Sequence, residues 1–377
     1  MRSAVVLVTG LVALFLSSQA QGPQTEGEWN VADPDYIWEF PKDHWPHEGF
    51  KTEWWYFTGL LHEGDAQEPT LGYQFTVFKI GIVPEVPPAE SEWSAANVLM
   101  GHLAGTDLAS GTHRFSEVLN RAASPLAGFE EPDTPLIAWS LPPPGTEGRW
   151  ELSLTETGFR FQGVDGDLLL DLRTDTASTL VFQGPGGYSR KSDTQGRASM
   201  YYSYTDLVTE GTVSLDGQTR RVAGTSWMDH EFSSNPLDEA QVGWDWFSLR
   251  LNDGRALMAF QLRDASGAPG FGHLSLVETD GSVRYLSDEE WSLSPGGMWT
   301  SPETDAAYPV SWHLSIPGSG LELEVQAVVR PQENVSERVP NLYYWEGAVA
   351  VRSPSGAPLG EGYLEMTGYG EGSRPAL

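Results

Sequence analysis

Residues 249–263 read LRLNDGRALMAFQLR, in which two runs of strand-forming residues flank an Asn-Asp-Gly turn at 252–254. Asp-Gly pairs favour the tight turns of β-hairpins. The same arrangement returns in GTVSLDGQTRRVAG, with its turn at 216–217, and in SLVETDGSVRYL, with its turn at 280–281. Short alternating strands recur from Glu53 to the C-terminus, whereas helical periodicity is nearly absent. The sequence therefore predicts an all-β protein whose antiparallel strands close into barrels or sandwiches.

The length of the chain, 377 residues, exceeds that of a typical single domain. Its 15 Trp, 13 Tyr and 15 Phe can fill two large cores. The segment FSSNPLDEAQVG, at 232–243, breaks the pattern with an Asn-Pro pair between two strong strand signals. We therefore predict one domain over residues 29–233 and a second over 234–377.

The first residues have the features of a Sec-type signal peptide. Residues 1–20 contain one early arginine, an apolar run from Ala4 to Phe15 and a small-x-small ending at Ser18 and Ala20. We therefore expect a secreted or periplasmic protein, with cleavage near Ala20. Because no later segment approaches the roughly 20 apolar residues that a membrane helix needs, we expect no membrane span.

Composition and the absence of common motifs narrow the function. The formal net charge of −30 repels phosphate backbones, so a nucleic-acid partner is not expected. The count of Cys is zero, which removes disulfides, thiol catalysis and Cys-based zinc sites. The sequence contains no GxSxG, no GxxxxGK[ST], no HExxH and no dinucleotide fingerprint. Ordinary serine-hydrolase and nucleotide-cofactor functions therefore lack support.

One strand sequence combines an acid with several rings. In EWWYF, at 53–57, Glu53 shares one face with two large rings, whereas Trp54 and Tyr56 take the other face. A carboxyl group on an apolar wall tends to have a raised pKa, which suits a general acid, unless a cation or backbone donors hold it ionised. The alternative is that Glu53 only bonds a neighbouring loop or strand.

Two segments place an acid next to a histidine. They are Asp43-His44-x-x-His47, in a proline-flanked loop, and Asp229-His230-Glu231, at the end of a strand. An acid beside a histidine fixes the ring tautomer and raises its basicity, which makes a proton shuttle near neutral pH. Alternatively, the two pairs form one buried hydrogen-bonded knot that joins the chain where the domains meet. A third interpretation is a metal site made of His44, His47 and His230 with an acid.

A second aromatic strand, GWDWF at 243–247, places an acid between two indoles, so that Trp244 and Trp246 share one face and Asp245 takes the other. Aromatic walls with a few convergent polar groups are typical of a pocket for an apolar or flat ligand, although they also describe a barrel core. The predicted ligand-binding residues are His47, Trp54, Tyr56, Trp227, Trp244, Asp245 and Trp246.

Seven motifs in order resemble those of the AttH and carotenoid 1,2-hydratase (hydroxyneurosporene synthase) family, often labelled predicted secreted hydrolases. They are DHxxHxxxxxEWWYFTG, GYQFTVFK, YYSYTDLVTEG, GTSWMDHEF, GWDWFSLRLNDG, YYWEGAVAV and GEGYLEMTGY, from about Phe40 to Tyr369. The resemblance implies two tandem lipocalin-like antiparallel β-barrel or β-sandwich domains, with a hydrophobic cavity at or near their interface. The motifs EWWYF and WMDHEF resemble those of the AttH branch of the family. In addition, Phe260 and Gln261 stand where the hydratase branch carries Tyr and Asp.

The carotenoid branch of this family adds water across a terminal isoprenoid double bond without a cofactor, and distant fungal relatives guide pericyclic ring closures. Hydration needs an acid to protonate the alkene, rings to stabilise the cation and a base to accept a proton from water. Here Asp229 or Glu231 is expected to be the acid and His230 the base, with Tyr56, Trp244 and Trp246 around the cation. Asp43, His44 and Glu53 complete the candidate catalytic set, and no cofactor or metal is expected.

These observations predict an exported, cofactor-independent hydratase or hydrolase that acts on a small hydrophobic molecule, isoprenoid- or lipid-like. The alternative is a non-catalytic lipocalin-like carrier, in which the rings bind a hydrophobic ligand and the Asp-His knot is structural. The two differ in whether the acids and histidines face the ligand or only one another.

Overall fold

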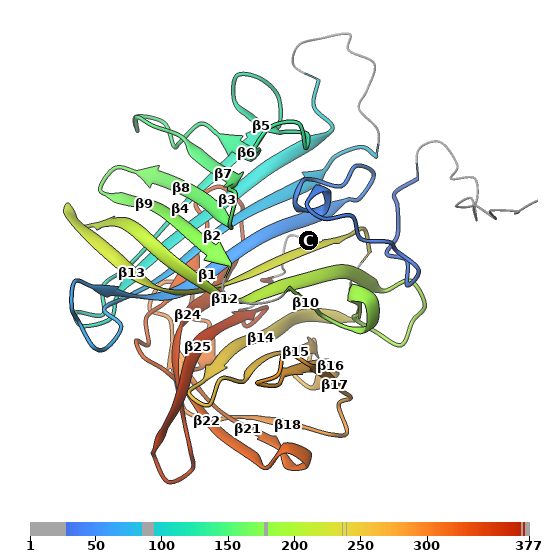
Figure 1. The fold of residues 1–377 in the computed structure, drawn as a ribbon, viewed down its shortest axis with the longest axis vertical. Helices are drawn as coiled ribbons and strands as arrows, with labels where there is room; N and C mark the ends of the chain where they lie inside the picture. The colour runs from blue at the N-terminus through green and yellow to red at the C-terminus, as the bar shows by residue number, and fades with distance from the viewer. Residues whose placement is uncertain are drawn as a thin grey trace, which may run out of the picture.

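The computed structural model describes residues 28–84, 94–176, 180–235, 237–238, 240–370 and 372–373. The predicted signal peptide lies outside these residues. Within them nearly all of the regular secondary structure is antiparallel β-strand, which confirms the predicted class, and the strands form two large curled sheets (Figure 1). No helix in the described ranges is long and apolar enough to cross a membrane. The helices are η1 (Lys42–His44), η2 (Pro185–Gly187) and η3 (Pro317–Ser319).

The first sheet curls into a nearly closed barrel, drawn in blue to yellow in Figure 1. Its strands are β1 (Thr52–Glu63), β2 (Leu71–Gly81), β3 (Asn97–Asp107), β4 (His113–Arg121), β5 (Ala127–Phe129), β6 (Leu136–Ser140), β7 (Trp150–Leu154), β8 (Phe159–Asp165), β9 (Leu168–Thr176), β10 (Val181–Phe182), β11 (Tyr188–Arg190), β12 (Ala198–Leu215) and β13 (Gln218–Ser233). They pair in the order β4-β3-β2-β1-β13-β12-β9-β8-β7-β6-β5, and β10 and β11 also pair with β12.

The second sheet is a half-barrel, drawn in yellow to red. Its strands are β14 (Gln241–Leu251), β15 (Ala256–Asp264), β16 (Pro269–Val277), β17 (Val283–Leu286), β18 (Ser292–Pro295), β21 (Ser311–Ile316), β22 (Leu321–Ala327), β23 (Glu333–Val335), β24 (Tyr343–Arg352) and β25 (Pro358–Thr367), and β19 (Met298–Thr300) and β20 (Ala307–Pro309) form a separate ribbon. The main order is β17-β16-β15-β14-β25-β24-β22-β21-β18, with β23 beside β24.

All three predicted hairpins are confirmed. The turns at 216–217, 252–254 and 280–281 join β12 to β13, β14 to β15 and β16 to β17. The predicted boundary between residues 233 and 234 falls between the two sheets. That each side folds as a domain of its own stays a prediction.

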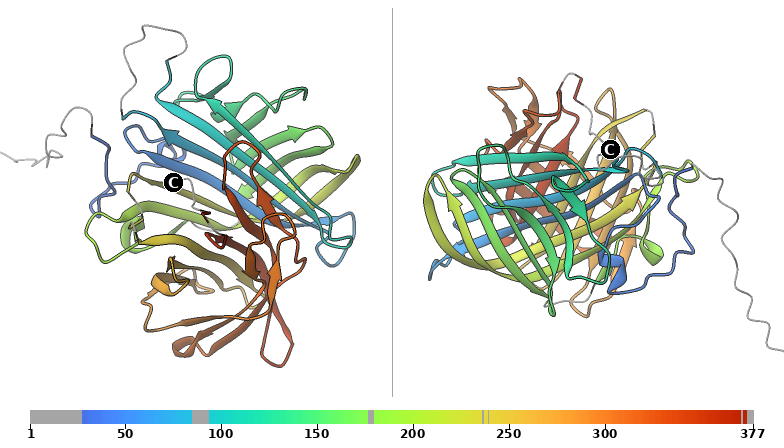
Figure 2. Two further views of the ribbon diagram at one scale, coloured as in Figure 1. Left: turned by 180° about the vertical axis from the view of Figure 1, so that it is seen from behind. Right: turned by 90° about the horizontal axis from the view of Figure 1, so that it is seen from above.

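Strand alternation decides which side chains face the space between the sheets. On β1, Trp55 and Phe57 are fully buried in the core of the first barrel. Trp54 and Tyr56 point the opposite way and pack in a third apolar cluster, to which both sheets contribute. This cluster includes Tyr201 of β12 and Trp246 of β14. The two sheets therefore share a buried aromatic contact. Figure 2 shows the backbones of the barrel and the half-barrel from two further sides.

A polar contact joins the sheets beside this aromatic cluster. Asn334 donates from Nδ2 to Gln74 Oε1 at 2.8 Å, and its own Oδ1 lies 2.9 Å from His113 Nε2. Nearby, His102 Nδ1 lies 2.7 Å from the hydroxyl of Tyr344. Because these polar side chains bond across the junction, they fix how one sheet sits on the other.

The buried His102 is expected to make stability depend on pH. Burial lowers the pKa of His102 to about 3, so the ring stays neutral in the folded chain at pH values where the unfolded chain binds a proton. Stability is then present above about pH 6.5 and falls by about 1.4 kcal/mol per pH unit below it, for this residue alone. The free energy of unfolding, measured with urea at pH values between 6.5 and 5, should depend less steeply on pH, by about that amount, in His102→Gln. An unchanged slope would contradict neutral burial.

Candidate active site between the sheets

Strand β13 presents its polar residues to two different places. His230 stacks on Trp55, at 4.6 Å between ring centroids, and so faces the barrel side. Asp229 and Glu231 point the other way and line a cavity between the sheets. The predicted Asp229–His230 pair is therefore wrong, because neighbouring residues of a strand face opposite sides.

The partner of His230 is Glu53 of β1, a fully buried carboxylate. Glu53 Oε1 lies 2.8 Å from His230 Nε2 and 2.7 Å from His47 Nδ1. Its other oxygen, Oε2, accepts the backbone N–H of His47 at 2.8 Å and lies 3.3 Å from Lys79 Nζ. Both oxygens are thus held by donors from three separate segments.

Tyr202 of β12 and two residues of η1 complete this network. The hydroxyl of Tyr202 lies 2.7 Å from His44 Nδ1 and 2.8 Å from His230 Nδ1. Asp43 accepts the backbone N–H of Glu39 at 2.5 Å, and its Oδ1 lies 3.5 Å from Nε2 of His47. We call the whole network the polar knot; its members are Asp43, His44, His47, Glu53, Lys79, Tyr202 and His230.

The charges of the polar knot compensate one another. Burial alone raises the pKa of Glu53, but the positive charges of His47 and Lys79 outweigh it and hold that pKa well below its usual range. Burial opposes protonation of His47, yet Glu53 and Asp43 raise its pKa. Burial lowers the pKa of His44 to about 3, so this ring is neutral. An ionised acid beside two cations describes a satisfied structural network.

The residues that come close enough to share a metal ion differ from the predicted set. Among the described residues, the ligand atoms of His47, Glu53 and His230 lie within 4.8 Å of one another, whereas His44 is outside that group and bonds Tyr202. His47 Nδ1 and His230 Nε2 both lie at hydrogen-bond distance from Glu53 Oε1. The other carboxylate oxygen, Oε2, already forms an ion pair with Lys79. This geometry fits a hydrogen-bonded knot.

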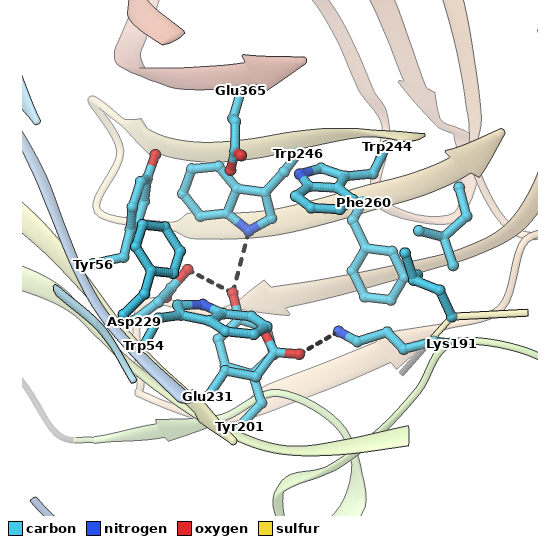
Figure 3. A pocket seen from close by; sticks show the side chains of 13 residues that line it. Trp54, Tyr56, Lys191, Tyr201, Asp229, Glu231, Trp244, Trp246, Phe260 and Glu365 are labelled. Atoms are coloured by element: carbon cyan, nitrogen blue, oxygen red, sulfur yellow. Dashed lines mark hydrogen bonds and ion pairs between the residues drawn. The ribbon is translucent and has the colours of Figure 1, made fainter. Parts of the chain in front are cut away.

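The cavity lies on the opposite face of β1 and β13 from the polar knot and has a volume of about 90 Å³. In Figure 3, Trp244, Trp246 and Glu365 reach in from the second sheet, whereas Trp54, Tyr56, Tyr201, Asp229 and Glu231 come from the first. The lining is mostly aromatic, with three carboxyl groups set into it. The complete lining is Trp54, Tyr56, Phe78, Lys191, Tyr201, Asp229, Glu231, Leu237, Trp244, Trp246, Phe260, Leu262 and Glu365.

Asp229 is held in place by three donors. Its Oδ1 accepts from Ser203 Oγ and, at 2.7 Å, from Trp227 Nε1. Its Oδ2 accepts from the hydroxyl of Tyr201 at 2.5 Å, and that hydroxyl in turn accepts from Trp246 Nε1 at 3.2 Å. Burial raises the pKa of Asp229 to about 7, although the three hydrogen bonds oppose the shift. A carboxyl group with a pKa near neutrality suits proton transfer.

Glu365 of β25 is the second titratable acid of the cavity. Burial raises the pKa of Glu365 to about 8; the charges of Asp229 and Glu231 add to this effect, and a hydrogen bond from Trp244 opposes it. Glu231 instead forms an ion pair with Lys191, at 2.9 Å, and accepts a hydrogen bond from Ser199. Asp229 and Glu365 thus face one cavity from different sheets, and burial brings the pKa of each close to neutrality, where carboxyl groups can exchange protons.

The other predicted ligand residues fall into two groups. Trp54, Tyr56, Trp244 and Trp246 line the cavity, and Trp227 lies behind Asp229, to which its indole donates. By contrast, His47 belongs to the polar knot, and Asp245 lies outside the cavity. Asp245 points into the half-barrel of the second sheet. Its Oδ2 lies 2.9 Å from Arg263 Nε, and its Oδ1 lies 2.8 Å from the hydroxyl of Tyr369.

Sequence reasoning missed seven of the lining residues, and the three polar ones among them are Lys191, Tyr201 and Glu365. Glu365 carried a usable signal, since it alternates with Leu364 and Met366, which lie in the core of the second sheet. Tyr201 alternates with Tyr202 in the same way and faces the cavity, whereas Tyr202 faces the knot. Lys191 follows the short strand β11, and no pattern marks it.

The comparisons with known proteins agree with this fold. A family model described as AttH-like matches residues 31–369. The crystal structure of an AttH protein from Nitrosomonas europaea is 31% identical, with a TM-score of 0.78, over 90% of this chain and 99% of that one. No curated protein matches the sequence.

Two more distant structures share the fold. Kievitone hydratase from Nectria haematococca is 14% identical, with a TM-score of 0.63, over 90% of this chain and 95% of that one. CghA is 12% identical, with a TM-score of 0.55, over 91% of this chain and 97% of that one. The matched motifs, the two sheets and the AttH-like model agree, and the chain belongs to the AttH-like family.

Proposed function

We propose that the protein is a cofactor-independent enzyme of the hydratase type that acts on a small hydrophobic molecule in the cavity between the sheets. The observation that carries the proposal is a pair of carboxyl groups, Asp229 and Glu365, which face one aromatic cavity from opposite sheets. Their pKa values, about 7 and about 8, favour a carboxylate at Asp229 and a protonated acid at Glu365 between those pH values. The shared fold with kievitone hydratase, a hydratase by name, fits this reaction class.

The reaction would use these residues in order. Glu365 gives its proton to one carbon of a substrate double bond, which breaks the π bond and leaves a cation on the neighbouring carbon. The faces of Trp244 and Trp246 stabilise that cation. A water molecule adds its oxygen to the cationic carbon, and Asp229 takes the proton that the water loses. One water is consumed, and the cycle closes when Asp229 releases the proton it took and Glu365 gains one from the solvent.

This assignment replaces His230 as the base. His230 is fully buried in the polar knot on the barrel side of β13, with both ring nitrogens bonded. Asp229 instead lines the cavity. Export, which we propose from residues 1–20, would place the enzyme in the periplasm or outside the cell.

The test is incorporation of water into a defined alkene. Short isoprenoid alcohols such as geraniol, incubated with the protein in water enriched in ¹⁸O, should give a product heavier by one labelled water. Because activity needs ionised Asp229 and protonated Glu365, it should rise with pH through about 7 and fall through about 8. The plot of activity against pH should lose its rising limb in Asp229→Asn and its falling limb in Glu365→Gln. A flat profile, or label uptake equal to that without protein, would contradict the proposal.

A carrier remains the second candidate because the polar knot is internally bonded and turned away from the cavity, as a carrier requires. In that case a hydrophobic molecule extracted from the purified protein should be stoichiometric and chemically unchanged after prolonged incubation. Its conversion by the wild type, but not by Glu365→Gln, would exclude a purely carrying role.

A further inference from the structure

The cavity between the sheets contains an ion pair in addition to the two acids of the proposed reaction. Lys191, which follows β11, and Glu231 of β13 both line the cavity, and Lys191 Nζ lies 2.9 Å from Glu231 Oε1. Figure 3 shows the ammonium group reaching in on the side of Phe260 and pointing toward Glu231. Lys191 is only 7% exposed and Glu231 only 4%. Because apolar residues in place of a buried ion pair are often neutral or stabilising, stability alone does not explain a pair in this aromatic wall.

Neighbouring groups hold the ion pair in place. Ser199 Oγ donates to Glu231 Oε1, and Lys191 Nζ donates to Ser189 Oγ at 3.2 Å. The two serines are register partners in the pairing of β11 with β12. The ammonium group also lies over the ring of Phe260, 4.2 Å from its centroid. The pair is therefore positioned before any ligand enters.

Each member of the pair keeps one unused hydrogen-bonding group. An ammonium group has three N–H donors, and within the described ranges its oxygen acceptors are Glu231 Oε1 and Ser189 Oγ. Lys191 and Ser199 both bond Oε1 of Glu231, so that no donor among the described residues reaches Oε2, and this oxygen remains accessible. The ion pair thus offers one donor and one acceptor to a ligand in the cavity.

A hydroxyl group fits this combination, because its oxygen accepts a hydrogen bond while its proton is donated. A carboxylate on the ligand would accept from Lys191 but would meet the charge of Glu231, and an ammonium group would meet the charge of Lys191. We propose that Lys191 and Glu231 bind the hydroxyl group of the substrate, which is therefore a neutral unsaturated alcohol. The inference rests on the function proposed above and names its substrate class.

The wild-type protein tests this alcohol site with a series of ligands, without any need for turnover. The quenching of tryptophan fluorescence at pH 7.5 gives the affinity of each ligand. Geraniol should bind roughly tenfold tighter than the hydrocarbon myrcene, because a hydrogen bond to a charged group contributes about that factor. Geranic acid should also bind more weakly than geraniol. Equal affinities for geraniol and myrcene, or tighter binding of geranic acid, would overturn the proposal.

A double variant removes the hydroxyl-binding groups while leaving no charge buried alone. Lys191→Met/Glu231→Leu should bind geraniol roughly tenfold more weakly and myrcene at least as tightly as the wild type. Arg160→Met/Asp171→Leu, which removes an exposed ion pair outside the cavity, is the matched control and should leave both affinities unchanged. A double variant that keeps the wild-type preference for geraniol would overturn the proposal. If Lys191→Met/Glu231→Leu does not fold, the ligand series on the wild type still decides.

Kinetics separate binding of the hydroxyl group from a role in the chemical step. In Lys191→Met/Glu231→Leu the KM for geraniol should rise roughly tenfold, with a turnover number within about threefold of the wild type. A large fall in turnover number at unchanged KM would contradict a binding role. If the wild type hydrates neither geraniol nor myrcene, the proposed function fails, while the binding series still shows whether the cavity selects alcohols.

Discussion

Replacement of Asp229 by asparagine is expected to lower turnover by roughly 100- to 10,000-fold, the contribution typical of a positioned general base. Asparagine keeps the size of the side chain and can still accept from Trp227 and Ser203, but it cannot take a proton from water. The measurement is the initial rate of ¹⁸O incorporation at pH 7.5, with saturating geraniol and folded protein verified by circular dichroism.

The same variant should not lose stability. The pKa of Asp229 is raised in the folded chain, so the unfolded chain loses this proton first, and folding becomes less favourable as pH rises from about 4 to about 7. Asp229→Asn removes that cost and should unfold at equal or higher urea concentration at pH 8. Asp245→Asn is the matched control, because Asp245 is also buried but lies outside the cavity and forms an ion pair with Arg263. This variant should lose stability and keep its turnover number. Turnover within threefold of the wild type in Asp229→Asn would remove the catalytic assignment.

Glu53→Gln should have the largest effect on stability, a loss of about 3–5 kcal/mol in the free energy of unfolding. Glu53 is fully buried and compensates the charges of His47 and Lys79. Without it, Lys79 would stay in the core without its anion, and His47 would keep only Asp43, at 3.5 Å. The loss should be measured by urea unfolding at pH 7.

The acid limb of the stability profile gives a second readout for Glu53. The folded pKa of Glu53 is lowered, so its stabilisation is present above about pH 4.5 and disappears as pH falls below that value. Glu53→Gln should therefore flatten the profile below pH 4.5. Glu117→Gln offers a comparison, since Glu117 is also buried but within the described ranges accepts hydrogen bonds from neutral donors, namely Ser336 and two backbone N–H groups. A loss below 1 kcal/mol in Glu53→Gln would show that the polar knot is not a major source of stability.

The parts of the fold that depend on local sequence could be predicted. Asp-Gly turns identify hairpins, and period-two alternation on β1 correctly separates Trp54 and Tyr56 from Trp55. The same rule, applied to WMDHEF, would also have separated Asp229 from His230. That error came from treating adjacent residues as a pair, when adjacency in a strand places side chains on opposite faces.

Contacts between distant strands could not be predicted in this way. His230 meets Glu53 because β13 pairs with β1 in one particular register, in which Trp55 lies opposite His230. Lys79 joins them because β2 flanks β1 on its other edge, with Lys79 opposite Glu53. Likewise, Glu365 reaches the cavity only because β25 packs against the first sheet. Such positions follow from strand order and sheet packing, which a single sequence does not display.

On β13, His230 faces the barrel side, whereas Asp229 and Glu231 face the cavity. The polar knot therefore also affects how β13 pairs with β1. If β13 slipped by one residue against β1, His230 would turn into the cavity, and Asp229 and Glu231 would enter the aromatic core of the barrel. The bonds of His230 to Glu53 and Tyr202 oppose that slip, because no neighbouring residue of β13 can replace its two ring nitrogens. The knot thus acts as a register lock: by fixing one histidine on the barrel side, it determines which acids face the cavity.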